Sequence, residues 1–331
     1  MEYLTLIEAA KLVQDPLQRG VIEIFPRVSP VLERLPFMPP IKGMAYVYNR
    51  ESVLPGVAFR GINETYTPDT GVINPVVERL FPFGGITQVD RVLTKTQGNL
   101  NDIRAVHDGL KAKAAALLFT KNFFKGDNTT NPKEFDGLEK RLTGSQVINP
   151  GLGNFSLACL DAAIDAVQGT PDVIFCNKVC RREISAAVRA AGQTIESITD
   201  AFGRQLEAYA GIPIVPVEDD ENGDPILGWD EGGASTSIYV VKFGIQEYVC
   251  GLQAGPMDVI DLGLQSGIFY QTLIEAIWGL AVFHPKSAAR YRHITQSTSV
   301  CLSTEETVSS TTTTSSSTTT TTSTSTTTTT A

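Results

Sequence analysis

Residues 101–125, NDIRAVHDGLKAKAAALLFTKNFFK, decide the fold of this 331-residue chain. Apolar side chains recur there at spacings of three and four residues, the period of an amphipathic helix. They are Ile103, Val106, Leu110, Ala114, Leu117, Leu118 and Phe124. Asp102 suits the first turn, Lys125 suits the last turn, and Gly126 predicts the stop. Such a helix spans about 35 Å, so it predicts a spine on which the rest of the fold is built.

The chain before this helix predicts an arm and a ribbon. Residues 2–13 can form a short amphipathic helix, and the prolines between residues 26 and 40 are expected to break every further helix and central strand of the arm, residues 1–43. The arm stays apolar, so it must lie on its own body or on a neighbour. Residues 44–95 predict a long two-stranded ribbon, in which residues 44–50 pair with residues 72–79. An isolated ribbon is marginal in water and needs a surface to rest on.

The chain after the helix predicts an α+β body of two lobes joined around it. Residues 157–209 indicate the order helix, strand, helix, helix, with a short buried strand at 171–176. Strands are expected at 212–217, 257–262 and 269–283, and residues 237–243 are expected to pair with 246–252 across Gly244. The acidic run 218–224 contains Asn222-Gly223, a strong signal for a hairpin turn. A calcium loop is disfavoured because its twelfth position would be Trp229 instead of glutamate.

Composition limits the function. The chain has 27 Lys and Arg against 36 Asp and Glu, a formal charge of −9, which is the opposite sign to a dedicated nucleic-acid binder. Five cysteines are too few and too irregular for a disulfide framework and favour a reducing compartment. No signal peptide or membrane span is recognisable, so a soluble, unsecreted protein is expected. Residues 296–331 predict a flexible tail, since every residue from 309 to 330 is Ser or Thr.

No motif carries catalysis. The three histidines are too scattered for a metal cluster, and no phosphate loop or nucleophile elbow occurs. The basic stretch 284–293 fits either a phosphate contact or a solvated exit segment. We therefore expect no catalytic residue, no metal and no cofactor, and a structural component instead of an enzyme.

The order of elements resembles the major capsid proteins of tailed bacteriophages, in a podophage-type branch, on the fold that encapsulin shells share. Three stretches carry the likeness: residues 135–139 (FDGLE) after the helix, 207–214 (EAYAGIPI) and 278–290 (WGLAVFHPKSAAR). The resemblance implies an N-terminal arm (1–43), an E-loop hairpin (44–95), the spine helix with the first part of the P-domain (96–151), an A-domain (152–255), closing P-domain strands (256–295) and the tail (296–331).

The resemblance further implies hexamers and pentamers of an icosahedral shell that encloses double-stranded DNA with weak contact. Portal and scaffold or decoration proteins are the implied partners, besides other copies of the chain, and the implied location is the virion, assembled in the host cytoplasm without a membrane. The candidate contacts between subunits are Phe25, Phe37, Met38, Tyr46, Tyr48, Phe59, Arg60, Tyr66, Glu218, Asp220 and Asp224, the last three facing the capsomer centres. Some family members form an isopeptide bond from an E-loop lysine, but no lysine lies between Lys42 and Lys95.

Two alternatives stay open. An encapsulin-type bacterial compartment would use the same fold and would hold a cargo enzyme in place of a genome. A surface adhesin with a Ser/Thr-rich stalk is disfavoured because neither a secretion signal nor a membrane anchor is recognisable.

Overall fold

The computed structural model describes residues 28–92, 100–199, 203 and 205–296. Residues 1–297 form one compact unit and residues 298–331 a second, and all described residues lie in the first. The predicted helix at 2–13, the contact candidate Phe25 and the Ser/Thr tail lie outside the described residues.

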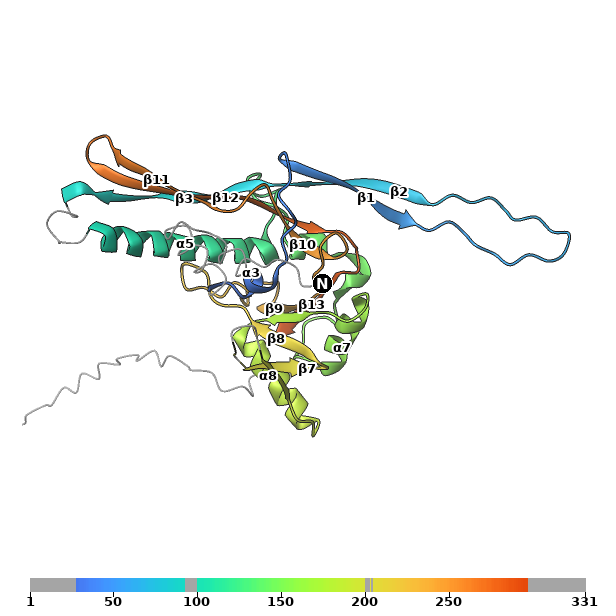
Figure 1. Cartoon of the computed structure of the whole chain (residues 1–331). Coiled ribbons are helices and arrows are strands. Elements are labelled where there is room, and N and C mark those ends of the chain that lie inside the picture. Colours follow the sequence, from blue (N-terminus) through green and yellow to red (C-terminus); the bar gives the residue numbers. More distant parts are fainter. Residues whose placement is uncertain (1–27, 93–99, 200–202, 204, 297–331) are drawn as a thin grey trace, which may run out of the picture. The chain divides into compact units, whose positions relative to one another are not determined.

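The predicted spine helix is confirmed as α5 (Leu100–Lys125), which packs under a four-stranded sheet (Figure 1). The strands are β3 (Phe81–Asp90), β10 (Val249–Gln253), β11 (Asp258–Gln265) and β12 (Phe269–Val282). β12 pairs with β3 along one edge and with β11 and β10 along the other. Trp278 of β12 is fully buried, with its ring centroid 4.8 Å from that of Phe37 and 5.7 Å from that of Phe119 on α5. The sheet and the helix therefore share one aromatic core.

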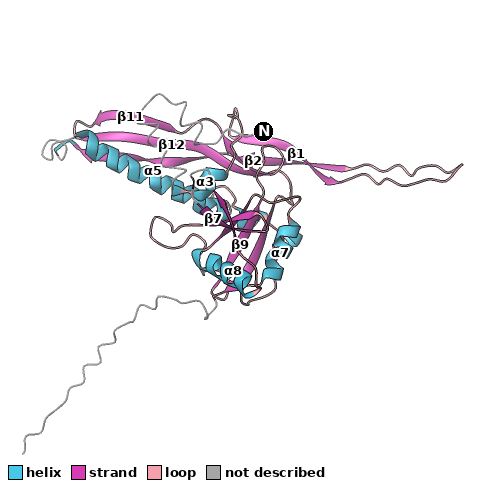
Figure 2. Ribbon diagram, turned by 60° about the horizontal axis from the view of Figure 1, so that its bottom comes forward, coloured by secondary structure: helices cyan, strands magenta, loops and turns pink. Residues whose placement is uncertain are grey.

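A seven-stranded sheet forms the second part of the fold, and two helices pack on one of its faces (Figure 2). Its order is β4 (Val147–Ile148), β13 (Ala288–Thr295), β9 (Ser235–Val241), β5 (Val173–Cys176), β8 (Ile212–Pro216), β7 (Gln205–Tyr209) and β6 (Glu196–Thr199). Alternation along β5 explains its complete burial: Val173 and Phe175 join the core cluster that holds the end of α5. Ile174 and Cys176 face α7 (Leu157–Ala166) and α8 (Lys178–Ala190).

The predicted ribbon is confirmed as a hairpin of β1 (Ala45–Val53) and β2 (Val72–Arg79), which pair antiparallel from Ala45 opposite Arg79. The prediction was wrong in extending the ribbon to residue 95, because β3 leaves the hairpin and pairs with β12 over its whole length. Figure 1 shows the hairpin continuing the line of β3 beyond the sheet. Three short helices complete the list: α3 (Pro30–Arg34), α6 (Leu138–Arg141) and the 3₁₀ turn η1 (Gly144–Gln146).

Four other expectations are corrected. Pro30 starts α3 instead of preventing it, because a proline in the first turn loses no helical hydrogen bond. Residues 196–199 and 205–209 form the strand pair β6 and β7, not a further helix. β9 and β10 do not pair with each other: β9 lies between β13 and β5, whereas β10 joins β12 in the other sheet. Most of the basic stretch 284–293 is no solvated exit segment, since β13 lies inside the seven-stranded sheet from residue 288 on, whereas Pro285 and Lys286 are exposed.

The domain bounds implied by the resemblance stay a prediction, although β10 and β13 each join the sheet on the other side of those bounds. Among the described residues, none of the helices combines the length and the apolar character that crossing a membrane requires.

Candidate assembly surface

Aromatic side chains hold the base of the β1–β2 hairpin against the body. Tyr46 and Tyr48 project from one face of β1, and their ring centroids lie 6.1 and 4.5 Å from that of Phe283. The Tyr48 hydroxyl donates to the Val282 carbonyl at 2.9 Å, and burial raises its pKa. Arg50 donates from Nε to the Phe283 carbonyl at 3.0 Å and from its terminal nitrogen to the Tyr48 hydroxyl at 2.8 Å. The two predicted contact tyrosines thus anchor the hairpin within its own chain.

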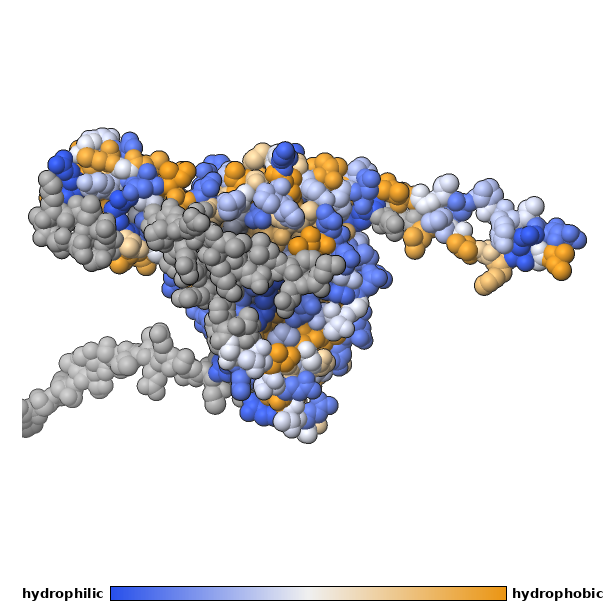
Figure 3. Space-filling model, in the orientation of Figure 1, coloured by the Kyte–Doolittle hydropathy of each residue, from blue (hydrophilic) through white to orange (hydrophobic). Residues whose placement is uncertain are grey.

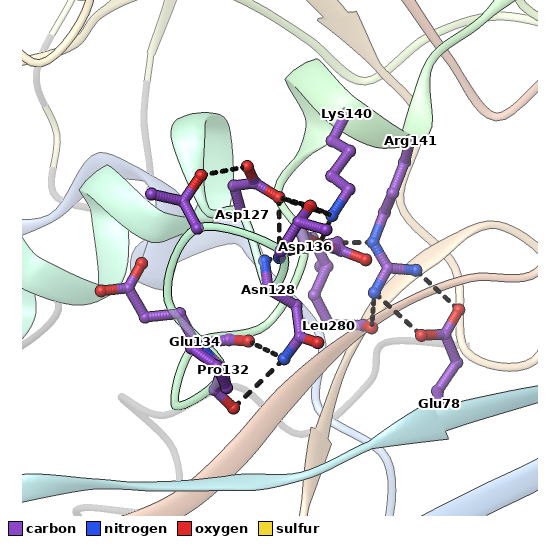
Figure 4. Close-up of polar contacts among 11 residues, drawn as sticks. Glu78, Asp127, Asn128, Pro132, Glu134, Asp136, Lys140, Arg141 and Leu280 are labelled. Carbon is purple, nitrogen blue, oxygen red and sulfur yellow. Dashed lines mark hydrogen bonds and ion pairs between the residues drawn. The ribbon is translucent and has the colours of Figure 1, made fainter.

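An ion pair fixes the other strand of the hairpin (Figure 4). Glu78 of β2 accepts two hydrogen bonds from the Arg141 guanidinium of α6, at 2.6 and 2.8 Å. The same guanidinium donates to the Asp136 carbonyl at 2.6 Å and to the Leu280 carbonyl of β12 at 3.1 Å. The two side chains are 9% and 16% exposed, so the pair is largely withdrawn from water. Arg141 therefore joins the hairpin, α6 and β12 at one point.

The loop between α5 and α6 holds Arg141 in place. Lys140 pairs with Asp136 at 2.8 Å and also with Asp127, and its ammonium lowers the pKa of both carboxyl groups. Asn128 closes the loop by donating to the Glu134 carbonyl at 2.8 Å (Figure 4). Gly137 is required here, since a Cβ would lie 2.6 Å from the Asn122 carbonyl oxygen. These bonds hold the loop that precedes Arg141, and the Lys140 ammonium group pairs with both the Asp127 and the Asp136 carboxylate.

The tip of the hairpin is the opposite of its base, because residues 54–71 are all exposed. Phe59 is fully exposed, as are Val57 at 95% and Ile62 at 94%. Figure 3 shows apolar side chains at the outer end of the hairpin. Within the tip, Arg60 lies over the Tyr66 ring at 5.4 Å and donates to the Glu64 carbonyl at 3.0 Å. The three predicted contact residues Phe59, Arg60 and Tyr66 therefore lie on one exposed, internally braced loop.

A second exposed apolar surface lies on the four-stranded sheet. Ile86 of β3, Leu273 of β12 and Ile260 of β11 stand opposite one another across three strands. Ile86 is 48% and Ile260 is 47% exposed. We call this row, together with the exposed Phe269 four residues before Leu273 on the same face of β12, the sheet patch. Sequence reasoning expected strands near β11 and β12 but placed β3 in the ribbon. It did not single out the exposed side chains of these strands, since alternation alone does not tell which face is covered.

The structure does not support the expectation that Phe37 and Met38 of the arm contact a neighbouring subunit. Both are buried, at 7% and 3% exposure, and Met38 is held by a backbone bond to the Gly251 carbonyl at 2.9 Å. Phe37 fills the space that the missing Cβ of Gly251 leaves, 2.5 Å from where that atom would lie. This part of the arm lies on its own body and leaves these two side chains no surface to offer a neighbour.

The acidic run forms the expected tight turn, in which Gly223 has a φ of +88° and its N–H donates to the Asp220 carbonyl. Asp220 pairs with Lys121 of α5 at 3.1 Å, and backbone N–H donation together with this lysine lowers its pKa. Glu218 pairs with Lys178 at 2.6 Å, while Asp224 is exposed at the turn. Two of the three carboxylates are thus neutralised within the chain. Across the described residues, no group of three His, Cys, Asp or Glu is placed to hold a metal ion.

Sequence reasoning missed the residues that orient the hairpin. Arg50, Glu78 and Arg141 act through partners 63 to 233 positions away in the chain. Arg50 lies between Asn49 and Glu51, and Arg141 follows Lys140, so nothing in the local sequence distinguishes either arginine from a surface charge.

Comparison with known proteins matches this geometry to shell subunits. Residues 14–158, just under half of the chain, match the family model "Major capsid protein GP7". No curated protein matches the chain. Among solved structures, the holo-SrpI encapsulin complex from Synechococcus elongatus PCC 7942 aligns with a TM-score of 0.62 at 14% identity, over 81% of this chain and 88% of that one.

Two phage-related capsids align similarly. The capsid of the native GTA particle has a TM-score of 0.56 at 13% identity, over 81% of this chain and 90% of that chain. The protein from Mycobacterium phage Bobi has a TM-score of 0.53 at 15% identity, over 80% and 89%. These alignments, at 13–15% identity, show that the chain has the fold of these shell subunits. The match to the family model therefore makes residues 14–158 similar to major capsid proteins, on a fold that the chain shares with these capsid subunits.

Proposed function

We propose that the chain builds hexamers and pentamers of an icosahedral phage shell by laying the tip of its hairpin on the sheet patch of the next subunit. The observation that carries this proposal is the contrast within the hairpin: a base fixed by Tyr48, Arg50 and the Glu78–Arg141 pair, and a tip with Phe59 fully exposed. An anchored strand pair that ends in bare apolar side chains needs a partner to cover them.

The sheet patch supplies a surface of matching chemistry. Its exposed residues are aliphatic or aromatic, and the patch lies on strands that the body already holds rigid. Burying one phenylalanine stabilises a contact by about 2–3 kcal/mol. Repetition around a ring of subunits multiplies this gain, which is how obligate assemblies are stabilised.

The interior of the proposed shell holds double-stranded DNA with weak contact. Support comes from the net charge of −9, since a negative wall does not trap a duplex. We further propose a portal and scaffold or decoration proteins as partners. One similar structure, with a TM-score of 0.51, is described as the satellite phage P4 procapsid including size determination (Sid) protein.

Assembly of three purified chains tests the contact. Wild-type protein is expected to form closed particles visible by negative-stain microscopy, as is Thr67→Asp, a control that adds the same charge to the same exposed loop. Phe59→Asp is expected to raise the protein concentration needed for assembly at least about thirtyfold, from the lost burial. Unchanged assembly of Phe59→Asp would remove the basis of the proposal.

The encapsulin alternative is supported by the similarity to the SrpI complex and is weaker than the phage assignment. Particles purified from the native source separate the two. Nuclease-protected double-stranded DNA supports the phage shell, whereas a protein cargo without protected DNA supports the compartment.

A further inference from the structure

One stripe of α5 is covered over only half its length. Val106, Leu110, Lys113, Leu117 and Thr120 follow one another at intervals of four, three, four and three residues, so they share one face of the helix. At the C-terminal end of this stripe the Thr120 hydroxyl bonds the Ser29 hydroxyl at 2.6 Å. One turn further back, Val28 lines a pocket of about 410 Å³ together with Lys113 and Leu117.

The rest of the stripe is bare. Leu117 is only 7% exposed, whereas Val106 is 61% and Leu110 is 59% exposed. Apolar side chains that continue a buried stripe and are themselves more than half exposed indicate that a further segment belongs on them.

The chain itself points to that segment. Ser29 bonds Thr120, and Val28 lines the same pocket as Lys113 and Leu117, so the described chain begins beside the covered half of the stripe. Twenty-seven residues precede Val28. Residues 2–13 carry the amphipathic pattern with Leu4, Ile7 and Leu12, and twelve helical residues span about 18 Å. The four steps from Val106 to Leu110 span about 6 Å, so a helix of that length is long enough to cover the bare part of the stripe.

The segment between the predicted helix and Val28 is also long enough for this docking. Residues 14–27 can reach up to about 45 Å when extended, more than the distance back along the stripe requires.

We propose that residues 2–13 form a helix that docks on Val106 and Leu110 of the same chain. The occupant is the arm of the same subunit, and the docking does not depend on shell formation. It would keep this face of α5 from offering apolar surface to other proteins before the subunits assemble.

Hydrogen exchange on the unassembled full-length chain tests the docking. In wild type, amides within residues 4–12 are expected to exchange at least about tenfold more slowly than in an unstructured chain. The double variant Val106→Glu with Leu110→Glu is expected to lose this protection. Ala105→Glu with Leu118→Glu, two exposed positions outside the stripe on the same helix, is the control and is expected to keep it. Absent protection in wild type, or protection that survives in the stripe variant, would overturn the proposal.

A cross-link identifies the occupant independently of those variants. Ile7→Cys combined with Leu110→Cys is treated with a short bismaleimide, with each single variant as a control. A product with the mass of one chain supports docking within the chain. A product with the mass of two chains shows a neighbour's arm on the stripe and rejects the assignment, as does the absence of any product specific to the pair.

Discussion

Arg141 offers the sharpest test of how the hairpin is held. Arg141→Met leaves the Glu78 carboxylate, 9% exposed, without its partner and also removes the bonds to the Asp136 and Leu280 carbonyls. Removing one member of a buried ion pair costs about 3–5 kcal/mol, because an uncompensated charge stays buried. Glu78→Gln keeps the shape and still accepts one hydrogen bond, so we expect a smaller loss of about 1–3 kcal/mol. The double variant should lose less than the sum, with a coupling energy of about 2 kcal/mol.

Urea unfolding of the unassembled chain measures these losses as shifts in midpoint at unchanged slope. Lys178→Met is the matched control, because its pair with Glu218 is 48% and 55% exposed and contributes at most about 1 kcal/mol. Limited proteolysis within residues 54–71 reports on the hairpin itself and should accelerate only when the Glu78–Arg141 pair is broken. Additive losses in the double variant, or an Arg141→Met loss no larger than that of Lys178→Met, would refute the clamp.

Three further predictions concern the core, the ionisation of the body and the chemistry of the hairpin. Trp278→Ala should cost about 3–5 kcal/mol in urea unfolding, since it empties the centre of the aromatic core. Burial raises the pKa of Asp108 above its unfolded value of about 4, so the folded state loses stability as the pH rises from about 4 through the folded pKa. Asp108→Asn should therefore raise the Tm at pH 7 in calorimetry, and the gain should vanish below pH 4. Without a hairpin lysine, denaturing electrophoresis of mature particles should give a monomer band near 35.7 kDa, and a covalent ladder would contradict this.

Local signals predicted the elements whose pattern is self-contained. The three- and four-residue period marked α5 to within a residue, and an apolar run bounded by turn residues marked β5. The error at β13 has a physical reason: Arg290 looks like a surface residue in the sequence. In the fold it is 5% exposed and is paired with Glu139 and Glu231, each at 3.0 Å. Because these partners lie 151 and 59 positions away in the chain, the sequence around Arg290 does not show that its charge is paired and buried.

Strand pairing failed for a related reason. Residues 237–243 and 246–252 have the spacing of a hairpin, but β12 offers Val249 to Gln253 a longer ladder in another sheet, opposite residues 278–282. Tertiary competition of this kind decides pairing after local propensity has decided that both segments are strands. All four aromatic candidates of the hairpin stay predicted contacts between subunits. Phe59 and Tyr66 lie exposed on the tip, whereas Tyr46 and Tyr48 also pack against Phe283 of their own chain.

The geometry of β12 explains why one subunit can both give and receive the proposed contact. Its first half carries Leu273 of the sheet patch, and its last residues receive Arg141 at the Leu280 carbonyl and Tyr48 at the Val282 carbonyl. The base of the hairpin and the sheet patch are therefore held by opposite halves of a single fourteen-residue strand, and Trp278 packs in the core between Leu273 and Leu280. A contact repeated around a ring closes only if its two surfaces keep a constant relation within each subunit. We expect substitution of Tyr48 or Arg141, which bond to the carbonyls of β12, to alter the closure of the ring. Substitutions at the tip should change only the affinity between subunits.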